Sequence, residues 1–363
     1  MTEMVRAAVL VGPRQVDLRE FPRPQTGPDD GLLRIEACGI CGSDVEQYKG
    51  HLGGDRLPSI QGHEPLGIIE EVGERAAKRW NVEPGDRVAL EILIPCRTCD
   101  LCLTGRYMSC RSKRGSYGYS PIASEPSLWG GFAEYVYLHP NAILHKMRKD
   151  IPADVAVMFN PMGAGVRWAC HLGGLQLGDT VLILGCGQRG IAALIAAKAA
   201  GAATVIVTGL ERDHAKLALA REFGADHTIN VEREDTIERV TEITDGAMAD
   251  IVLELTPMAT QPVIHALQAV RHGGRVVLAG LKGGRTVEMR SDMIINKAIT
   301  VVGAYGVDSR AYSEAIRIIE SGRFPLERMH THTFPLADTA RAIETLAGEV
   351  PGEDAVHVAI TPA

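Results

Sequence analysis

The first 150 residues alternate short hydrophobic runs with polar and turn-forming residues. Gly, Pro and Asp bound each run, which is typical of the strands of a β-rich unit. No internal repeat or low-complexity segment interrupts this pattern. The pattern predicts strands at 4–11, 16–21, 32–37, 66–72, 87–92 and 132–138.

Beyond about residue 150 the pattern changes to continuous hydrophobic runs separated by helical segments rich in Ala and Leu. Such runs are typical of parallel strands that helices cover on both faces. After about residue 305 two helices and a last strand at 356–360 follow, and the pattern assigns this tail to neither part. The predicted parallel strands are 181–184, 204–208, 251–255, 276–279 and 299–302, with helices such as 191–200 and 214–223.

A glycine-rich turn directly follows the predicted strand 181–184. In a strand–turn–helix context, glycines permit a tight turn and the close approach of a pyrophosphate, and the helix N-terminus attracts the anion. The sequence therefore predicts a doubly wound unit that binds a dinucleotide, with a ligand-free turn as the less favoured alternative. The residues of the turn are Gly185, Cys186, Gly187, Gln188, Arg189 and Gly190.

The end of the next strand is expected to contact the adenosine ribose, commonly through an acid. Here Gly209 stands at the strand end, followed by Glu211 and Arg212. Glu211 would accept a hydrogen bond from a ribose 2′-hydroxyl and repel a 2′-phosphate, whereas Arg212 would attract the phosphate. We expect NAD, with NADP possible. The alternative for both side chains is a solvated helix start, where acids favour the helix dipole.

Composition and charge exclude several classes of function. The 363 residues carry 38 Lys and Arg against 45 Asp and Glu, a formal net charge of −7. Without a strongly basic block, we expect no nucleic-acid partner. The N-terminus lacks an export-signal pattern, and Lys198 and Gly201 interrupt the most apolar stretch. We therefore expect no membrane span and a cytoplasmic protein.

Eight cysteines need an explanation in a chain of this length. Four of them lie within fifteen residues, at the spacing of a loop that wraps a tetrahedral Zn²⁺: Cys96, Cys99, Cys102 and Cys110. Such a site is structural, because thiolates take every position. The alternatives are reduced bystander thiols, two disulfides, or a zinc ribbon for nucleic acid with the basic segment 111–114.

A second set of possible metal ligands lies in the β-rich part. Cys41 is followed closely by Ser43, and His63 is followed by Glu64. A thiolate, an imidazole and a carboxylate suit Zn²⁺, and three protein ligands leave a fourth position open. Taken alone, a small buried Cys41 and a hydrogen-bonded loop His63 are the preferred interpretations.

The order of motifs resembles the zinc-dependent medium-chain dehydrogenases/reductases, especially the sorbitol and threonine dehydrogenase branches. The resemblance covers essentially the whole chain and implies an α/β protein. A split, GroES-like, β-rich catalytic domain would comprise residues 1–158 and 306–363, and a Rossmann cofactor domain with a doubly wound parallel sheet residues 159–305. The motifs are CGICGSD (38–44), GHEPLGIIEEVG (62–73), VEPGDRVAL (82–90), the four-cysteine segment, GGFAEYV (130–136) and LQLGDTVLILGCGQRG (175–190).

The resemblance also implies roles for individual residues. Cys41 and His63 match catalytic zinc ligands, and Glu64 matches a carboxylate that binds this zinc directly or through water. Ser43 matches the hydroxyl that begins a proton relay from the substrate. The four clustered cysteines match a structural zinc, which makes two Zn²⁺ per chain. Further cofactor contacts are expected from Thr256, Ala279, Gly280, Leu281, Ala304 and Tyr305.

Two positions depart from the family pattern. Asn160 stands where a further zinc ligand, Cys, Glu or Asp, is usual. A neutral amide is a poor zinc ligand, so Asn160 would leave zinc to the other ligands and water, or would serve substrate or cofactor. Glu46 stands where many relatives have His, and is the candidate for the end of the proton relay.

These inferences predict an alcohol dehydrogenase. It would exchange a hydride reversibly between a small alcohol, with a secondary alcohol or polyol favoured, and a nicotinamide cofactor. One alternative is a zinc-free enone or quinone reductase of the same fold, which should lack both sets of metal ligands. The other is a non-enzymatic dinucleotide-binding protein, supported by Asn160. From the resemblance we expect a homodimer or homotetramer.

Overall fold

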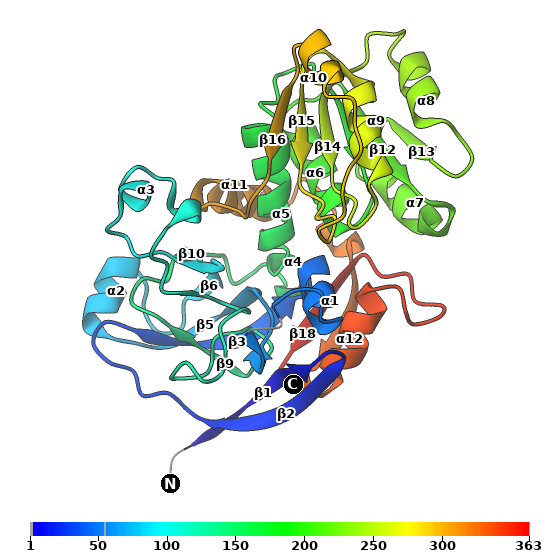
Figure 1. Ribbon diagram of the computed structural model, residues 1–363. Helices are drawn as coiled ribbons and strands as arrows, with labels where there is room; N and C mark the ends of the chain where they lie inside the picture. The colour runs from blue at the N-terminus through cyan, green and yellow to red at the C-terminus, as the bar shows by residue number, and fades with distance from the viewer. Residues whose placement is uncertain (1–2, 54–55, 363) are drawn as a thin grey trace. The chain divides into compact units, whose positions relative to one another are not determined.

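The computed structural model describes residues 3–53 and 56–362. The chain forms two compact units, coloured along the chain in Figure 1. Unit 1 consists of Met1–Phe159 and His330–Ala363, and unit 2 of Asn160–Met329. Among the described residues, no helix has the length and hydrophobicity needed to cross a membrane.

Unit 1 is built mainly of strands, as the alternating pattern predicts. These are β1 (Met4–Gly12), β2 (Gln15–Pro22), β3 (Gly31–Gly39), β4 (Ser59–Ile60), β5 (Glu64–Val72), β6 (Arg87–Leu90), β7 (Leu93–Ile94), β8 (Gly115–Ser116), β9 (Tyr135–Leu138), β10 (Leu144–Lys146), β17 (His330–Pro335) and β18 (His357–Thr361). The largest sheet has the order β10-β6-β5-β3-β18-β17, with β9 paired to β3. A second sheet has the order β2-β1-β4, and β7 pairs with β8.

Short helices connect the strands of unit 1. They are α1 (Gly42–Tyr48), α2 (Glu74–Trp80), α3 (Asp100–Leu103), α4 (Ala153–Ala156) and α12 (Thr339–Leu346), with 3₁₀ turns η2 (Tyr107–Ser109) and η6 (Leu336–Asp338). The last strand, β18, pairs antiparallel with the end of β3. The backbone N–H of Ile40 also donates to the carbonyl of Val358 at 2.9 Å. This pairing makes the last strand of the chain part of unit 1.

Unit 2, every residue of which is described, contains one parallel sheet. Its strands are β11 (Thr180–Leu184), β12 (Thr204–Gly209), β13 (His227–Asn230), β14 (Ala249–Glu254), β15 (Val270–Leu278) and β16 (Thr300–Gly303). Their order is β13-β12-β11-β14-β15-β16, with every neighbouring pair parallel. The order reverses between β11 and β14, which is the switch point where doubly wound sheets bind dinucleotides.

The helices of unit 2 are α5 (Phe159–Gly165), which begins at the last residue of unit 1's first segment, α6 (Gln188–Ala199), α7 (His214–Glu222), α8 (Thr236–Ile243), α9 (Gln261–Ala269), α10 (Asp292–Asn296) and α11 (Ser309–Glu320). Shorter segments are the π-helical η3 (Val166–Leu172) and the 3₁₀ turns η4 (Glu211–Asp213) and η5 (Leu326–Arg328). In α6 every residue from Ile191 to Ala197 is at most 1% exposed. A helix that is hydrophobic all round packs on all sides, so α6 is held firmly against the sheet.

Unit 2 continues to Met329, beyond the boundary predicted at residue 305. Helix α11 accounts for the difference. Its Tyr312 hydroxyl accepts a hydrogen bond from Asn160 Nδ2 at 2.8 Å, and its Glu314 pairs with His171 Nε2 at 2.7 Å. The sequence predicted a helix after residue 305, but could not show which unit this helix would pack against.

Candidate active site and cofactor site

Unit 1 brings Cys41, His63 and Glu64 together. Cys41 precedes α1, His63 lies just before β5, and Glu64 is the first residue of β5. All three side chains are buried, and their donor atoms lie within 4.8 Å of one another. A sulfur, a nitrogen and an oxygen donor at these distances fit a single Zn²⁺. The geometry therefore favours the metal role over the separate, non-metal interpretations of Cys41 and His63.

Asp44, which the sequence analysis did not select, orients this cluster. Its carboxylate is fully buried. It accepts hydrogen bonds from His63 Nδ1 at 3.2 Å and from the backbone N–H groups of Cys41 at 2.9 Å and Gly62 at 3.4 Å. With its Nδ1 hydrogen directed to Asp44, His63 turns Nε2 toward the cluster, which is the arrangement of metal-binding imidazoles. The available signal was a carboxylate three residues after a candidate ligand.

The electrostatics at His63 follow from the same contacts. Burial lowers the pKa of His63, but the Asp44 carboxylate and neighbouring groups more than offset it, so the pKa lies well above its usual value. The carboxylate of Glu64 is a second negative group near His63, with its Oε1 3.9 Å from His63 Nε2. The site therefore concentrates negative charge, which suits a divalent cation.

Ser43 lies beside the cluster. Its Oγ is 3.4 Å from His63 Nε2, and it accepts a hydrogen bond from the Tyr119 hydroxyl at 3.1 Å. The Glu46 carboxylate, the candidate for the end of the relay, instead pairs with His51 Nδ1 at 2.7 Å. Tyr119 is thus a site residue that the sequence analysis missed. No local motif connects it to Ser43.

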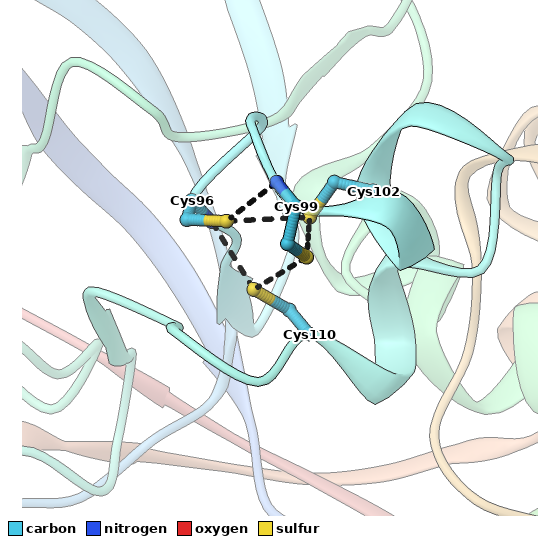
Figure 2. Close-up of side chains that lie close together, drawn as sticks. All are labelled: Cys96, Cys99, Cys102 and Cys110. Carbon is cyan, nitrogen blue, oxygen red and sulfur yellow. Dashed lines mark hydrogen bonds between the residues drawn. The ribbon is translucent and has the colours of Figure 1, made fainter.

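The four clustered cysteines converge on one point, as Figure 2 shows. The Sγ–Sγ distances include 3.8 Å between Cys96 and Cys102, 3.5 Å between Cys99 and Cys102, and 3.9 Å between Cys99 and Cys110. Four sulfurs about 2.3 Å from a shared Zn²⁺ at tetrahedral angles lie about 3.8 Å apart. A disulfide needs about 2.05 Å. The four-cysteine segment has the geometry of a tetrathiolate zinc site, and all four cysteines are free thiols.

The glycine-rich turn stands between the buried strand β11 and helix α6. Gly187 caps α6, and Gly190 lies in its first turn. A Cβ at Gly190 would be 2.0 Å from the Gly185 carbonyl oxygen, so only glycine permits this approach. Cys186 Sγ lies 2.7 Å from the position of a Cβ at Gly209, which places the turn against the end of β12. The turn and β12 thus meet at the carboxyl edge of the sheet.

Comparisons with known proteins agree with this geometry. Residues 27–149 match the family model of the alcohol dehydrogenase GroES-like domain, and residues 190–321 match that of zinc-binding dehydrogenases. A protein of Mycobacterium tuberculosis described as a probable alcohol dehydrogenase is 41% identical over 364 residues, covering 99% of each chain. The chain belongs to the zinc-type medium-chain dehydrogenases/reductases.

Two further relatives extend the comparison. The erythritol/L-threitol dehydrogenase of Mycolicibacterium smegmatis is 33% identical and covers 99% of this chain and 98% of its own. Among solved structures, a protein of Sinorhizobium meliloti described as a zinc-binding dehydrogenase and bound to NADP has a TM-score of 0.87 at 27% identity. It covers 99% of this chain and 100% of its own. The predicted fold class, a GroES-like unit with a Rossmann cofactor unit, is confirmed.

Asn160, the position where the resemblance implied a further zinc ligand, is fully buried in α5. Within unit 2 both ends of its amide make hydrogen bonds. Its Nδ2 donates to the Tyr312 hydroxyl at 2.8 Å, and its Oδ1 accepts from Arg189 Nη2 at 3.2 Å. The Arg189 guanidinium also lies 5.3 Å above the Trp168 ring. Asn160 therefore positions Arg189, a predicted cofactor residue.

Glu211, expected to contact the ribose, lies after β12 in η4 and is exposed. Its carboxylate contacts the side-chain amide of Asn230, the last residue of β13, and the guanidinium of Arg233, just beyond that strand. Arg212 follows on the same turn. Arg233 is a second residue that the sequence analysis missed, although a basic residue soon after the third strand was a possible signal.

The other predicted cofactor residues lie at the carboxyl ends of the later strands. Thr256 contacts Gly185, since its Cγ2 is 3.2 Å from the position of a Cβ there. Thr256 also hydrogen-bonds the buried carboxylate of Glu254, which pairs with Lys282 Nζ at 2.8 Å. The backbone N–H groups of Ala279, Gly280 and Ala304 donate to strand carbonyls. The side chains of Leu281 and Tyr305 are exposed.

Proposed function

We propose that this chain is a zinc-dependent alcohol dehydrogenase that oxidises secondary alcohols or polyols with NAD⁺ in a reversible reaction. The observation that carries the proposal is the buried cluster of Cys41, His63 and Glu64, with the Ser43 hydroxyl beside it. When bound there, Zn²⁺ acidifies an alcohol and polarises a carbonyl, and a nicotinamide cofactor exchanges the hydride.

The protein's own groups have separable tasks. Cys41 Sγ, His63 Nε2 and a Glu64 carboxylate oxygen would hold the metal, with the fourth position free for substrate. Asp44 fixes the tautomer and direction of His63. Ser43 would hydrogen-bond the substrate oxygen. Burial of the ligands strengthens these interactions because they compete less with water.

We assign a second, structural Zn²⁺ to Cys96, Cys99, Cys102 and Cys110. The sulfur–sulfur distances support this assignment. A hydrogen bond from the Thr98 backbone N–H is the main cause that lowers the pKa of Cys96 to about 5, which favours the thiolate that zinc requires. Because these thiols must stay reduced to bind metal, we assign the protein to the cytoplasm.

The preference for NAD rests on Glu211 at the end of β12. Its carboxylate can accept a hydrogen bond from a ribose 2′-hydroxyl and repels a 2′-phosphate. Arg212 and Arg233 oppose this preference. Arg233 is already paired with Glu211, so part of its charge is neutralised. The ratio of kcat/KM for NAD⁺ and NADP⁺ tests the assignment, and a preference for NADP⁺ would contradict it.

The polyol preference is supported by relatives rather than by the site itself. The similar proteins include the erythritol/L-threitol dehydrogenase named above and sorbitol dehydrogenases of about 31% to 33% identity. A panel of secondary alcohols, polyols and, as a contrast, primary alcohols tests it. Reduction of enones by zinc-free enzyme, with no alcohol oxidation, would instead indicate the reductase function. Cofactor binding without turnover would indicate a non-enzymatic protein.

A homo-oligomer, dimer or tetramer, is supported by the apolar surface of unit 2. Apolar side chains on the edge strand β16 and in the segment between β15 and β16 are well exposed, at 37% for Val301, 66% for Leu281 and 74% for Ile295. An exposed edge strand beside apolar side chains is a surface that proteins usually cover. Sedimentation velocity of the wild-type protein distinguishes monomer, dimer and tetramer.

Cys41→Ser tests the catalytic assignment. The variant should hold one zinc per chain instead of two and lose alcohol oxidation. Cys38→Ser is a matched control, because Cys38 is an equally buried thiol on the adjacent strand whose Sγ contacts the Gly39 carbonyl at 3.6 Å. The control should retain both metals. Two zincs and full turnover in Cys41→Ser would overturn the proposal.

A further inference from the structure

The loop after β8 places Tyr119 against the proposed zinc site. The ring centroids of Tyr119 and His63 are 5.2 Å apart, and the Tyr119 hydroxyl donates to Ser43 Oγ at 3.1 Å. Phenolic O–H groups are better donors than aliphatic hydroxyls, which fits this direction. The side chain therefore contacts both the histidine of the proposed zinc site and Ser43.

The loop that carries Tyr119 is held in place on several sides. The Tyr119 N–H donates to the Ser116 carbonyl at 3.2 Å. The Ser120 hydroxyl donates to the same carbonyl at 3.0 Å and accepts from the Ser116 N–H at 3.2 Å. A Cβ at Gly118 (φ +76°) would lie 2.9 Å from His63 Cβ, so a glycine lets the loop contact the histidine. The phenol is thus presented to Ser43 by a rigid turn.

The hydrogens around Ser43 can be assigned from these contacts. A serine hydroxyl has one hydrogen to donate and two lone pairs to accept with. Tyr119 uses one lone pair of Ser43, which directs the serine's own hydrogen elsewhere. His63 Nε2 lies 3.4 Å from Ser43 Oγ, and the Nδ1 hydrogen of the same ring faces Asp44. A metal bound to Nε2 would prevent this nitrogen from accepting a hydrogen bond, which would leave the Ser43 hydrogen for a substrate oxygen.

We infer that Tyr119 is a positioning residue that makes Ser43 a hydrogen-bond donor toward the substrate oxygen. The inference rests on the proposed alcohol dehydrogenase function. A donor stabilises a negatively charged alkoxide oxygen more than a neutral alcohol, because the hydrogen bond is charge-assisted. Tyr119 thus favours the ionised substrate through Ser43. Glu46, engaged by His51, has no part in this arrangement.

A double-mutant cycle on kcat/KM tests the inference, with the zinc-loaded full chain and an alcohol that the wild type oxidises. Tyr119→Phe removes the hydroxyl and keeps the ring. In the wild-type background it should lower kcat/KM about tenfold, the effect of one hydrogen bond. In the Ser43→Ala background, where no hydroxyl remains to be oriented, it should change kcat/KM less than twofold. Such non-additivity is the signature of two residues that act together.

Tyr117→Phe is the matched control from the same loop. The Tyr117 hydroxyl is also buried but accepts from the His139 backbone N–H at 3.0 Å, away from Ser43. This variant should keep wild-type kcat/KM. Zinc content and Tm of each variant exclude loss of metal or folding as the cause of a kinetic change.

Each outcome has a distinct meaning. A Tyr119→Phe effect that is absent, or equal in both backgrounds, refutes the inference and leaves the alcohol dehydrogenase function in place. If Tyr117→Phe slows turnover as much as Tyr119→Phe, the effect belongs to the loop and the inference is wrong. A wild type that holds zinc but oxidises no alcohol refutes the proposed function first, and the inference with it.

Discussion

Replacement of Asp44 by Asn probes how the proposed catalytic zinc site is held. The Asp44 carboxylate is fully buried, with one oxygen accepting from Cys41 N–H and the other from His63 Nδ1 and Gly62 N–H. Asn has the same size but replaces one acceptor oxygen by an NH₂ donor. In either orientation of the amide, this donor faces an N–H group. The variant therefore removes a charge and creates a donor–donor contact.

The expected cost follows from these contacts. A hydrogen bond to a charged group contributes about 1.5–3 kcal/mol. Loss of a carboxylate that orients a metal-binding histidine typically lowers metal affinity about 10–100-fold. A tenfold change in affinity corresponds to about 1.4 kcal/mol, so a 10–100-fold loss of zinc affinity corresponds to about 1.4–2.8 kcal/mol. This free energy agrees with the contribution of the hydrogen bond. We expect zinc affinity at this one site to fall by about that factor.

Competition with a chelator of known affinity measures the effect. One zinc per chain should leave Asp44→Asn at lower chelator concentration than in the wild type, while the four-cysteine site serves as an internal reference. Glu46→Gln is the matched control, because Glu46 is on the same helix and its partner is the exposed His51. If Asp44→Asn releases both zincs at wild-type chelator concentrations, the role assigned to Asp44 is wrong.

Three further predictions follow from other parts of the chain. Cys102→Ser should lower zinc content by one per chain and lower Tm; unchanged metal analysis and unfolding curves would contradict the structural zinc. Glu211→Ala should raise the ratio of kcat/KM for NADP⁺ over NAD⁺ about tenfold, by removing charge repulsion of about 1.4 kcal/mol; an unchanged ratio would exclude Glu211 as the discriminating residue. Hydrogen bonds from Arg14 and Lys49 lower the pKa of Glu349 from its usual range to about 2. A carboxyl group whose pKa is lowered on folding stabilises the folded state at pH values above its unfolded-state pKa. This stabilisation is lost as the pH falls toward the folded-state pKa. Glu349→Gln should therefore cost about 1 kcal/mol in urea unfolding at pH 7, and progressively less between pH 4.5 and 2; a constant difference would refute this.

Much of the fold follows from short-range patterns. The four cysteines lie within one short segment, so their spacing alone predicts that a single metal can collect them. The glycine-rich turn is likewise a local feature, because strand, turn and helix are consecutive in the chain. The continuous hydrophobic runs predicted parallel strands, and the observed strand order has the doubly wound form. These predictions needed no knowledge of which distant segments meet.

Pairings between distant segments were not predictable in the same way. Tyr119 and Ser43 are 76 residues apart, and nothing in the local sequence of either indicates the other. Helix α11 has an apolar face that either unit could have covered, and only its packing in unit 2 decided where unit 2 ends. Arg233 reaches Glu211 because two neighbouring parallel strands, β12 and β13, end at the same edge.

The sequence by itself therefore determined which metal-ligand residue types and which glycine-rich turn are present. Its pattern of hydrophobic and polar residues determined that one part of the chain is β-rich and the other α/β. Only the tertiary structure determined how these side chains are oriented. Asp44 orients His63, the Tyr119 hydroxyl donates to Ser43, and Asn160 accepts a hydrogen bond from Arg189. The physical reason is that hydrogen bonds require donor and acceptor within about 3 Å. Such distances between segments far apart in the chain depend on strand register and loop packing, which local patterns do not specify.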